Sequence, residues 1–132
     1  PGSILLAGPM FWFEIGAADY SYGMGFWAPK AALMEAYRKA VDEHPEVLEK
    51  LVKRFNKQAQ FTLSGPEYAR KKTAPPPLLA AWYNKKSINL QHDAAPDERM
   101  FSQELAQDII EGFRTLMPLY KYFDALCAAE MV

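Results

Sequence analysis

The chain has 132 residues and a formal net charge of −1, with 50% hydrophobic and 23% charged residues. This balance predicts one globular domain with a substantial core. No run of about 18 apolar residues occurs, so no transmembrane helix is predicted. The single cysteine, Cys127, excludes an intramolecular disulfide and any zinc site built on paired cysteines. Its apolar helical surroundings indicate a buried thiol, and we expect a cytoplasmic protein.

The basic residues are unevenly distributed. Between Lys50 and Lys86, nine Lys or Arg residues accompany one acid, Glu67, which gives this segment a charge of +8 and the rest of the chain −9. Such asymmetry indicates either an anion-binding face or solvated helix faces whose acids lie nearby in space. A pI near 6.2 argues against nucleic acid as a partner.

The first expected elements form a hairpin. Residues 9–16 are dense in β-forming residues and apolar on both sides apart from Glu14, which is typical of a strand inside a sheet. Residues 20–27 alternate between two sets of side chains and predict a second, antiparallel strand after a tight turn. Gly23 and Gly25 share one face of this strand, where they leave either a groove for a helix or ligand or a site of close core packing.

Helices and short strands follow the hairpin. A helix is expected to begin near Pro29 and to end near His44, because the residue before Pro45 is disfavoured in helical geometry. The next predicted elements are a helix from Pro45, a strand at 60–63, a short helix at 78–85, a strand within 87–93 and a final helix capped by Ser102. Pro118 either kinks this last helix or starts a new one that runs to about Ala128.

Together these elements predict an α+β domain, with a mostly antiparallel sheet of about four strands packed by about four helices on one face. We expect residues 1–8 to be a tag remnant or flexible lead-in. Residues 9–128 are expected to form the single domain, and residues 129–132 a tail.

The search for chemistry is mostly negative. No phosphate-binding glycine loop and no HExxH motif occurs, and His44 and His92, the only histidines, do not indicate a metal site. We predict no catalytic residue, no metal and no cofactor. Three weaker groupings remain, and each also has a purely structural interpretation. They are the aromatics and glycines of 20–27, the basic loop 68–72, and the segment 82–87, where aromatics beside lysines would suit single-stranded nucleic acid.

The order of several motifs is similar to that of one family. The motifs are MFWFEIG, YSYGMGFWAPKAALMEAYRKAV, FTLSGPEYARKK, LLAAWYNKKSINL and SQELAQDIIEGFRTLMPLYKYF, and they resemble domain of unknown function 2461, a family of bacterial and fungal proteins. The resemblance extends from about Pro9 to Leu126 and corresponds to the C-terminal part of the family pattern. The chain is therefore expected to be a fragment, or a member without the first part. The resemblance implies an α+β fold and no particular reaction, and it implies a shared pocket lined by Tyr22, Trp27, Arg38 and Arg70.

From these residues we expect a domain that binds a small or extended anionic ligand. Tyr22 and Trp27 would form apolar walls, and Arg38 and Arg70 would supply charge. The alternative is a protein–protein interaction or self-association module that uses an exposed aromatic sheet face. An unpaired apolar strand at 9–16 would recruit a second copy of the chain and give a homo-oligomer, unless a separate N-terminal segment stays bound to it.

Overall fold

The computed structural model describes residues 8–26, 28–72, 76–95 and 102–131. Residues 130 and 131 are described by their main chain alone. The described part of the chain contains four strands, four α-helices and one 3-10 turn, which confirms the predicted α+β class. In chain order the elements are β1 (Pro9–Ile15), β2 (Tyr20–Phe26), α2 (Ala31–Glu43), α3 (Pro45–Phe55), β3 (Thr62–Ser64), η1 (Pro77–Leu79), α4 (Ala80–Tyr83), β4 (Asn89–Ala94) and α5 (Gln103–Met131).

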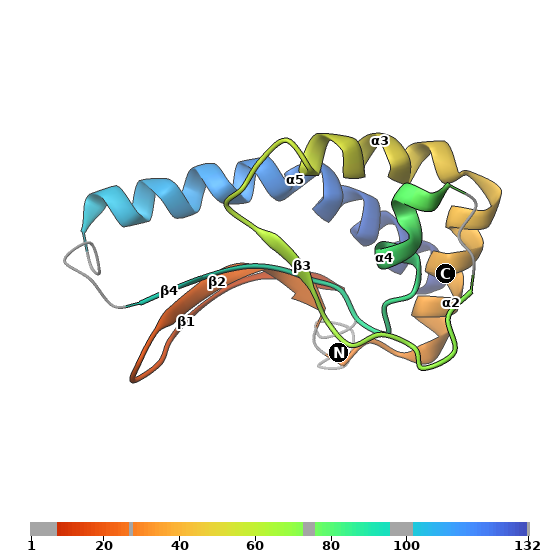
Figure 1. Ribbon diagram of the computed structural model, residues 1–132, viewed down its shortest axis with the longest axis horizontal. Helices are drawn as coiled ribbons and strands as arrows, with labels where there is room; N and C mark the ends of the chain where they lie inside the picture. Colours follow the sequence, from red (N-terminus) through yellow and green to blue (C-terminus); the bar gives the residue numbers. More distant parts are fainter. Residues whose placement is uncertain (1–7, 27, 73–75, 96–101, 132) are drawn as a thin grey trace.

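The sheet is antiparallel throughout and has the order β1-β2-β4-β3. β1 and β2 form the predicted hairpin, in which the Gly16 N–H donates to the Asp19 carbonyl over 2.7 Å. Helices α3 and α5 lie over one side of the sheet, and α2 stands at one end of it (Figure 1). No described helix covers the other side of the sheet, which is called its open side below.

The alternation of side chains along β2 shows which side of the sheet faces the core. Tyr20, Tyr22, Met24 and Phe26 are at most 8% exposed, and they point toward the helix layer because successive strand residues face opposite sides. The Phe26 ring meets Phe123 of α5 edge-on, with centroids 5.4 Å apart. The helices complete the core with other buried residues, including Leu116 and Leu119 of α5 and Tyr37 and Val41 of α2.

Helix α5 resolves the question about Pro118. It is one helix from Gln103 to Met131 with Pro118 inside it, and it continues past the end expected near Ala128. Figure 1 shows α5 bending part-way along its length, as expected where a proline removes a main-chain donor and its ring crowds the preceding turn. The predicted cap is confirmed, because the Leu105 N–H donates to Ser102 Oγ over 3.1 Å. Across the described ranges, no helix has the combination of length and apolarity that a bilayer span requires.

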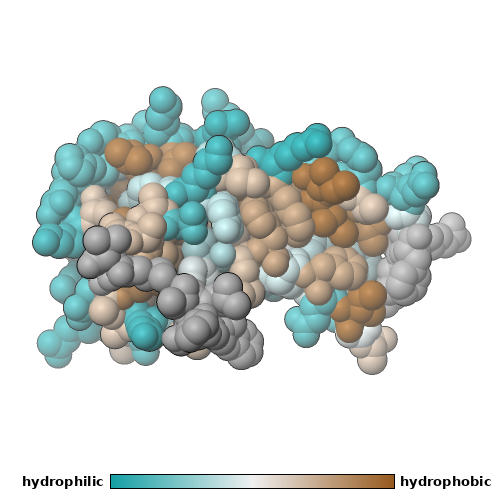
Figure 2. Space-filling model, turned by 180° about the vertical axis from the view of Figure 1, so that it is seen from behind, coloured by the Kyte–Doolittle hydropathy of each residue, from teal (hydrophilic) through white to brown (hydrophobic). Residues whose placement is uncertain are grey.

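The position of β1 agrees with the unpaired apolar edge expected at 9–16. β1 lies at the edge of the sheet, and no strand among the described residues pairs with its other side. On the helix side, Phe11 packs between Phe113 and Tyr120 of α5 at 4.6 and 4.9 Å. Phe13 and Ile15 extend toward the hairpin turn and are 44% and 49% exposed. Figure 2 views the molecule from behind, the side of β1, and shows hydrophobic side chains gathered on this face below a hydrophilic rim.

Candidate functional site

The open side of the sheet is hollowed above the glycines of β2. In the hairpin register, Gly23 lies opposite Trp12 and Gly25 opposite Met10. A Cβ atom on Gly23 would collide with the main-chain oxygen of Leu90, so β2 and β4 are too close there for any side chain. A groove of about 490 Å³ lies on this side, and its lining includes Met10, Trp12, Ser21, Asn89 and Gln91. The described aromatics of this stretch, Tyr20, Tyr22 and Phe26, lie in the core, whereas Gly25 lines the groove on the other side of the sheet.

Tyr22 faces away from this groove, into the core beneath α5. Its side chain is 2% exposed, and its ring lies against His92 at 5.0 Å and meets Phe61 edge-on at 5.7 Å. The Gln60 Nε2 group donates to the Tyr22 hydroxyl over 2.9 Å. Tyr22, Gln60 and His92 together form part of the wall of a polar cavity of about 320 Å³.

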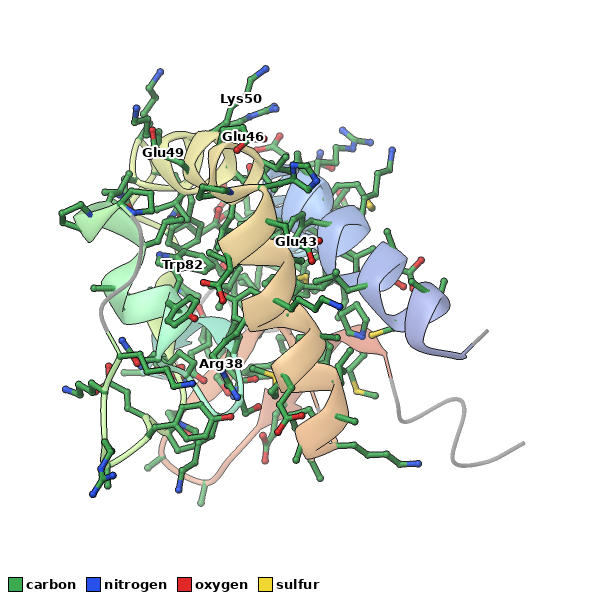
Figure 3. The ribbon with its side chains drawn as sticks, turned by 90° about the vertical axis from the view of Figure 1, so that its right-hand side faces the viewer. Arg38, Glu43, Glu46, Glu49, Lys50 and Trp82 are labelled. Atoms are coloured by element: carbon green, nitrogen blue, oxygen red, sulfur yellow. The ribbon has the colours of Figure 1, made fainter. Side chains whose placement is uncertain are left out.

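Arg38 lies in a different cluster, where α2 meets the loop after β3. Its Nη1 group donates to the Tyr68 hydroxyl over 2.6 Å, and its guanidinium carbon lies 4.5 Å from the centroid of the Tyr68 ring. The Lys86 ammonium is 5.9 Å from the same centroid. Two cations therefore lie against one tyrosine ring, attracted by its π electrons. Figure 3 shows Arg38 on α2 well separated from Glu43 at the far end of that helix and from Glu46 in the first turn of α3.

Asn84 holds the loop that carries Tyr68. The Tyr68 N–H donates to the Asn84 main-chain oxygen over 3.0 Å. The Asn84 side chain accepts from the Lys72 N–H over 2.9 Å and donates to the Lys72 oxygen over 3.0 Å. The buried Asn84 thus holds Tyr68 by its main-chain oxygen and Lys72 by its side-chain amide, so the Tyr68 ring has a defined position under Arg38.

The neighbouring lysines Lys85 and Lys86 lie in different environments, since Lys85 is buried and Lys86 is exposed. Lys85 pairs with Glu67 in an antiparallel bridge, is buried, and donates from Nζ to the Gly65 oxygen over 2.9 Å. Glu67 also forms a salt bridge with Lys71, with 3.2 Å between the ammonium and a carboxylate oxygen. The hydrogen bond and charge of Lys71, together with the charge of Lys85, lower the pKa of the Glu67 carboxyl. Glu67 is therefore already paired with Lys71 and Lys85. Lys86, the residue after Lys85, lies against the Tyr68 ring instead.

The acid one turn beyond Arg38 on α2 is also engaged, whereas Glu35, three residues before Arg38, is exposed. The engaged acid is Asp42, which accepts a hydrogen bond from the Tyr83 hydroxyl over 2.9 Å. Burial and this carboxylate together raise the pKa of Tyr83. Among the described residues, no acidic side chain forms an ion pair with Arg38 or Lys86. The Arg38–Tyr68–Lys86 corner, as we call these three residues, therefore carries a net positive charge.

The comparisons with known proteins give a family and nothing finer. A family model described as "Conserved hypothetical protein (DUF2461)" matches residues 4–122, nearly the whole chain. The chain belongs to this family. Neither the curated proteins nor the solved structures that were compared contain a match to it. DUF2461 membership confirms the resemblance seen in the sequence, and it assigns no activity.

The four residues predicted to share a pocket do not all lie together in this DUF2461 chain. Arg38 contacts Tyr68, and Arg70 follows two residues later in the same loop, exposed and without an ion pair among the described residues. Tyr22 belongs to the cavity under α5, whose lining does not include either arginine. Trp27 lies outside the described residues. The structure thus relates Arg38 to the loop of Arg70, and it separates Tyr22 from both.

The two basic segments singled out from the sequence lie side by side in the structure. Loop 68–72 supplies Tyr68 and segment 82–87 supplies Lys86, but their proximity has no signal in the sequence because it depends on the bridge between Glu67 and Lys85. Trp82 and Tyr83 are buried, so they are not available for base stacking. Within the described ranges, no group of three or more His, Cys, Asp or Glu side chains is arranged to hold a metal ion.

Proposed function

We propose that this domain binds a small or extended anionic ligand at the Arg38–Tyr68–Lys86 corner, with Arg70 assisting from the same loop. The observation that supports the proposal is the pair of cations on one tyrosine ring without an acidic partner among the described residues. Two like charges repel, and an anion between them would remove this repulsion. A guanidinium also presents a planar fork of donors that fits carboxylate and phosphate groups.

Hydrogen-bond polarity adds a third donor to the corner. The Arg38 guanidinium only donates, so the Tyr68 oxygen must accept the 2.6 Å hydrogen bond from it. The Tyr68 hydroxyl proton is then available for another acceptor. An anion at this corner would receive hydrogen bonds from Arg38, Tyr68 and Lys86 together. In this proposal Tyr68, and not Tyr22, forms the aromatic wall of the ligand site. The same role for Trp27 stays a prediction.

Binding of inorganic phosphate and pyrophosphate tests the proposal, measured by thermal shift and by calorimetry. Wild-type protein should be stabilised by the anion in proportion to its occupancy, and added NaCl should weaken the effect. Arg38→Gln and Lys86→Gln should each weaken binding about tenfold, the loss of one charge-assisted hydrogen bond. Arg114→Gln removes an exposed arginine of α5 and serves as the matched control. Equal affinity in wild type, Arg38→Gln and Lys86→Gln would refute this function, and the exposed Lys86 variant keeps the test valid if Arg38→Gln folds poorly.

Self-association through β1 is a second candidate, favoured by the exposed edge described above. An edge strand presents unpaired main-chain donors and acceptors, and the exposed Phe13 and Ile15 would add apolar contact to a second copy. Ile15→Lys should shift the protein toward the 15.0 kDa monomer in light scattering. Val47→Lys, which alters a residue of α3 that is similarly exposed at 46%, should leave the assembly unchanged. A wild-type protein that stays monomeric at every concentration would exclude this candidate.

A cytoplasmic location belongs to the same proposal. Cys127 is buried and forms no disulfide, and burial with the nearby Asp124 charge raises the pKa of its thiol to about 11. A cysteine outside any disulfide fits a reducing compartment. Cell fractionation checks the location.

A further inference from the structure

The side chains on the open side of the sheet form a pattern that the proposed anion site does not explain. Along β2, Ser21, Gly23 and Gly25 alternate with the buried core residues, so these three face the open side. Figure 1 shows the strands curving away from the helix layer, which makes the open side concave. The groove of about 490 Å³ lies on this concave side.

One row of residues on this side runs from an aromatic ring to an amide across a glycine. Trp12 of β1 pairs with Gly23 of β2, and Gly23 pairs with Gln91 of β4. Neighbouring strands lie about 4.8 Å apart, so the main chains that carry Trp12 and Gln91 are about 10 Å apart. No side chain fills the interval between them, because Gly23 occupies the middle of the row. Trp12 and Gln91 both line the groove, and they form its two borders at this level.

The next row repeats this arrangement with an amide that is not engaged. Met10 pairs with Gly25, and Gly25 pairs with Asn89. Asn89 Oδ1 occupies the space that a Cβ atom of Gly25 would need, so this amide leans over the glycine. Among the described residues, no hydrogen bond engages the Asn89 side chain. Its oxygen and its N–H groups can therefore serve a ligand in the groove.

Gln91 is fixed in position by its neighbours on the same side of the sheet. Its Nε2 group donates to the Asp93 carboxylate over 3.0 Å, and its Oε1 atom accepts from Ser64 Oγ over 3.3 Å. The Gln91 oxygen keeps a second lone pair for a further donor. Because this side chain is already held in place, little of its conformational entropy is lost when it binds a ligand.

The described lining of the groove favours an uncharged ligand. Glu14 is its only charged residue, and the lining contains neither lysine nor arginine, which disfavours an anion. The Glu14 side chain is exposed to solvent, where a single carboxylate gives a cation little binding energy. The remaining lining combines apolar side chains with neutral polar groups. This composition separates the groove from the Arg38–Tyr68–Lys86 corner, which carries positive charge.

We propose that this groove binds a neutral carbohydrate. A pyranose ring has C–H groups on its face and hydroxyls around its rim, so it needs an apolar plane together with groups that donate and accept. Trp12 supplies a large aromatic surface for the C–H face. The amides of Asn89 and Gln91, across the glycines, supply the hydrogen-bonding groups. The volume of about 490 Å³ is within the range for small-molecule sites.

NMR titration of the isotopically labelled complete chain with cellobiose tests this assignment. Cellobiose is a neutral disaccharide whose hydroxyls all lie at the rims of its rings. It should shift the signals of Gly23, Gly25 and the Trp12 indole N–H in a saturable way, and leave those of α5 unchanged. Sorbitol has similar hydroxyls but no ring face, and it should bind at least about tenfold more weakly. Nicotinamide is a neutral planar ring without a hydroxyl rim, and it should also bind at least about tenfold more weakly.

Variants of the two borders of the groove separate stacking from hydrogen bonding. Trp12→Ala should weaken cellobiose binding about tenfold, whereas Trp12→Phe, which keeps an aromatic ring, should stay within about threefold of wild type. Asn89→Ala should weaken binding about fivefold through the loss of one hydrogen bond. Val47→Lys alters an exposed residue of α3 on the other side of the sheet and is the matched control. Asn89→Ala supplies an independent variant if Trp12→Ala is unstable.

The outcomes are distinguishable from those of the anion test. Trp12→Ala should not change phosphate affinity, and failure of phosphate binding alone would leave the carbohydrate site standing. Three results would each overturn the proposal. They are the absence of a saturable shift with cellobiose, binding of sorbitol or nicotinamide as tight as that of cellobiose, and wild-type cellobiose affinity in both Trp12→Ala and Asn89→Ala.

Discussion

Replacing Gly23 with alanine should destabilise the domain more than the same change at Gly25. At Gly23, the new Cβ collides with the main-chain oxygen of Leu90 and lies 2.9 Å from Gln91 Cα. Both neighbours are main-chain atoms of β4, so no rotamer change relieves the overlap. At Gly25, the first collision is with Asn89 Oδ1, the end of a side chain that can rotate, and a main-chain oxygen lies 2.9 Å away.

The magnitude follows from what has to move. Relief at Gly23 requires β2 and β4 to separate around the Gly23–Gln91 pair, which weakens about two ladder hydrogen bonds worth about 1 kcal/mol each. Adding the strain of overpacking, we expect a loss of about 3 kcal/mol for Gly23→Ala. Gly25→Ala should cost about 1 kcal/mol, because Asn89 can move aside and the main-chain overlap is smaller. Both values are net of the lower entropy of alanine in the unfolded chain, which favours the variants equally.

Urea unfolding followed by circular dichroism measures these differences, with an unchanged m-value as the check that the same surface unfolds. Gly8→Ala is the matched control, since a Cβ atom at Gly8 has no neighbour within 4 Å, and its stability should stay within about 0.5 kcal/mol of wild type. If Gly23→Ala is as stable as Gly25→Ala, the close approach of β2 to β4 is not rigid, and the account of the groove floor is wrong.

Three further predictions concern two buried hydroxyl groups and the buried thiol. Tyr37→Phe should cost about 1 kcal/mol in urea unfolding because it removes the 2.9 Å hydrogen bond from its hydroxyl to the Trp82 oxygen. Tyr122→Phe should cost nothing or stabilise, because the buried Tyr122 hydroxyl has no partner among the described residues, and equal losses in the two variants would contradict this reasoning. The Cys127 thiol, whose pKa is raised to about 11 from its ordinary value of 9.0, should react with a disulfide reagent at pH 8 about 100-fold more slowly in the native protein than in denaturant. Rapid modification of the native protein would show that the thiol is accessible and ionised.

Several local elements were predictable because their signals lie within a few residues. The alternation along β2, the end of α2 before Pro45 and the Ser102 cap each depend on neighbours in sequence, and the structure has all three. The edge position of β1 follows from the hairpin, which supplies one neighbour only. Its composition is typical of a strand covered on both sides, and only the register shows that Trp12 and Met10 lie opposite glycines that leave them room. The continuity of α5 through Pro118 was also open, since a proline inside a helix is tolerated only where packing outweighs its cost.

The sequence by itself determined the fold class, the hairpin, the glycine face and the excess of basic residues between Lys50 and Lys86. Tertiary structure alone decided which of these charges remain unpaired. Arg38 and Tyr68 are 30 positions apart, and they meet only because Asn84 fixes the loop and α2 packs beside it. Lys85 and Lys86 have the same chemistry, but the bridge to Glu67 turns one inward to a carbonyl and leaves the other against an aromatic ring. Propensities act over a few residues, whereas the partner of a charge is set by long-range packing, so the candidate sites could be located only in the folded chain.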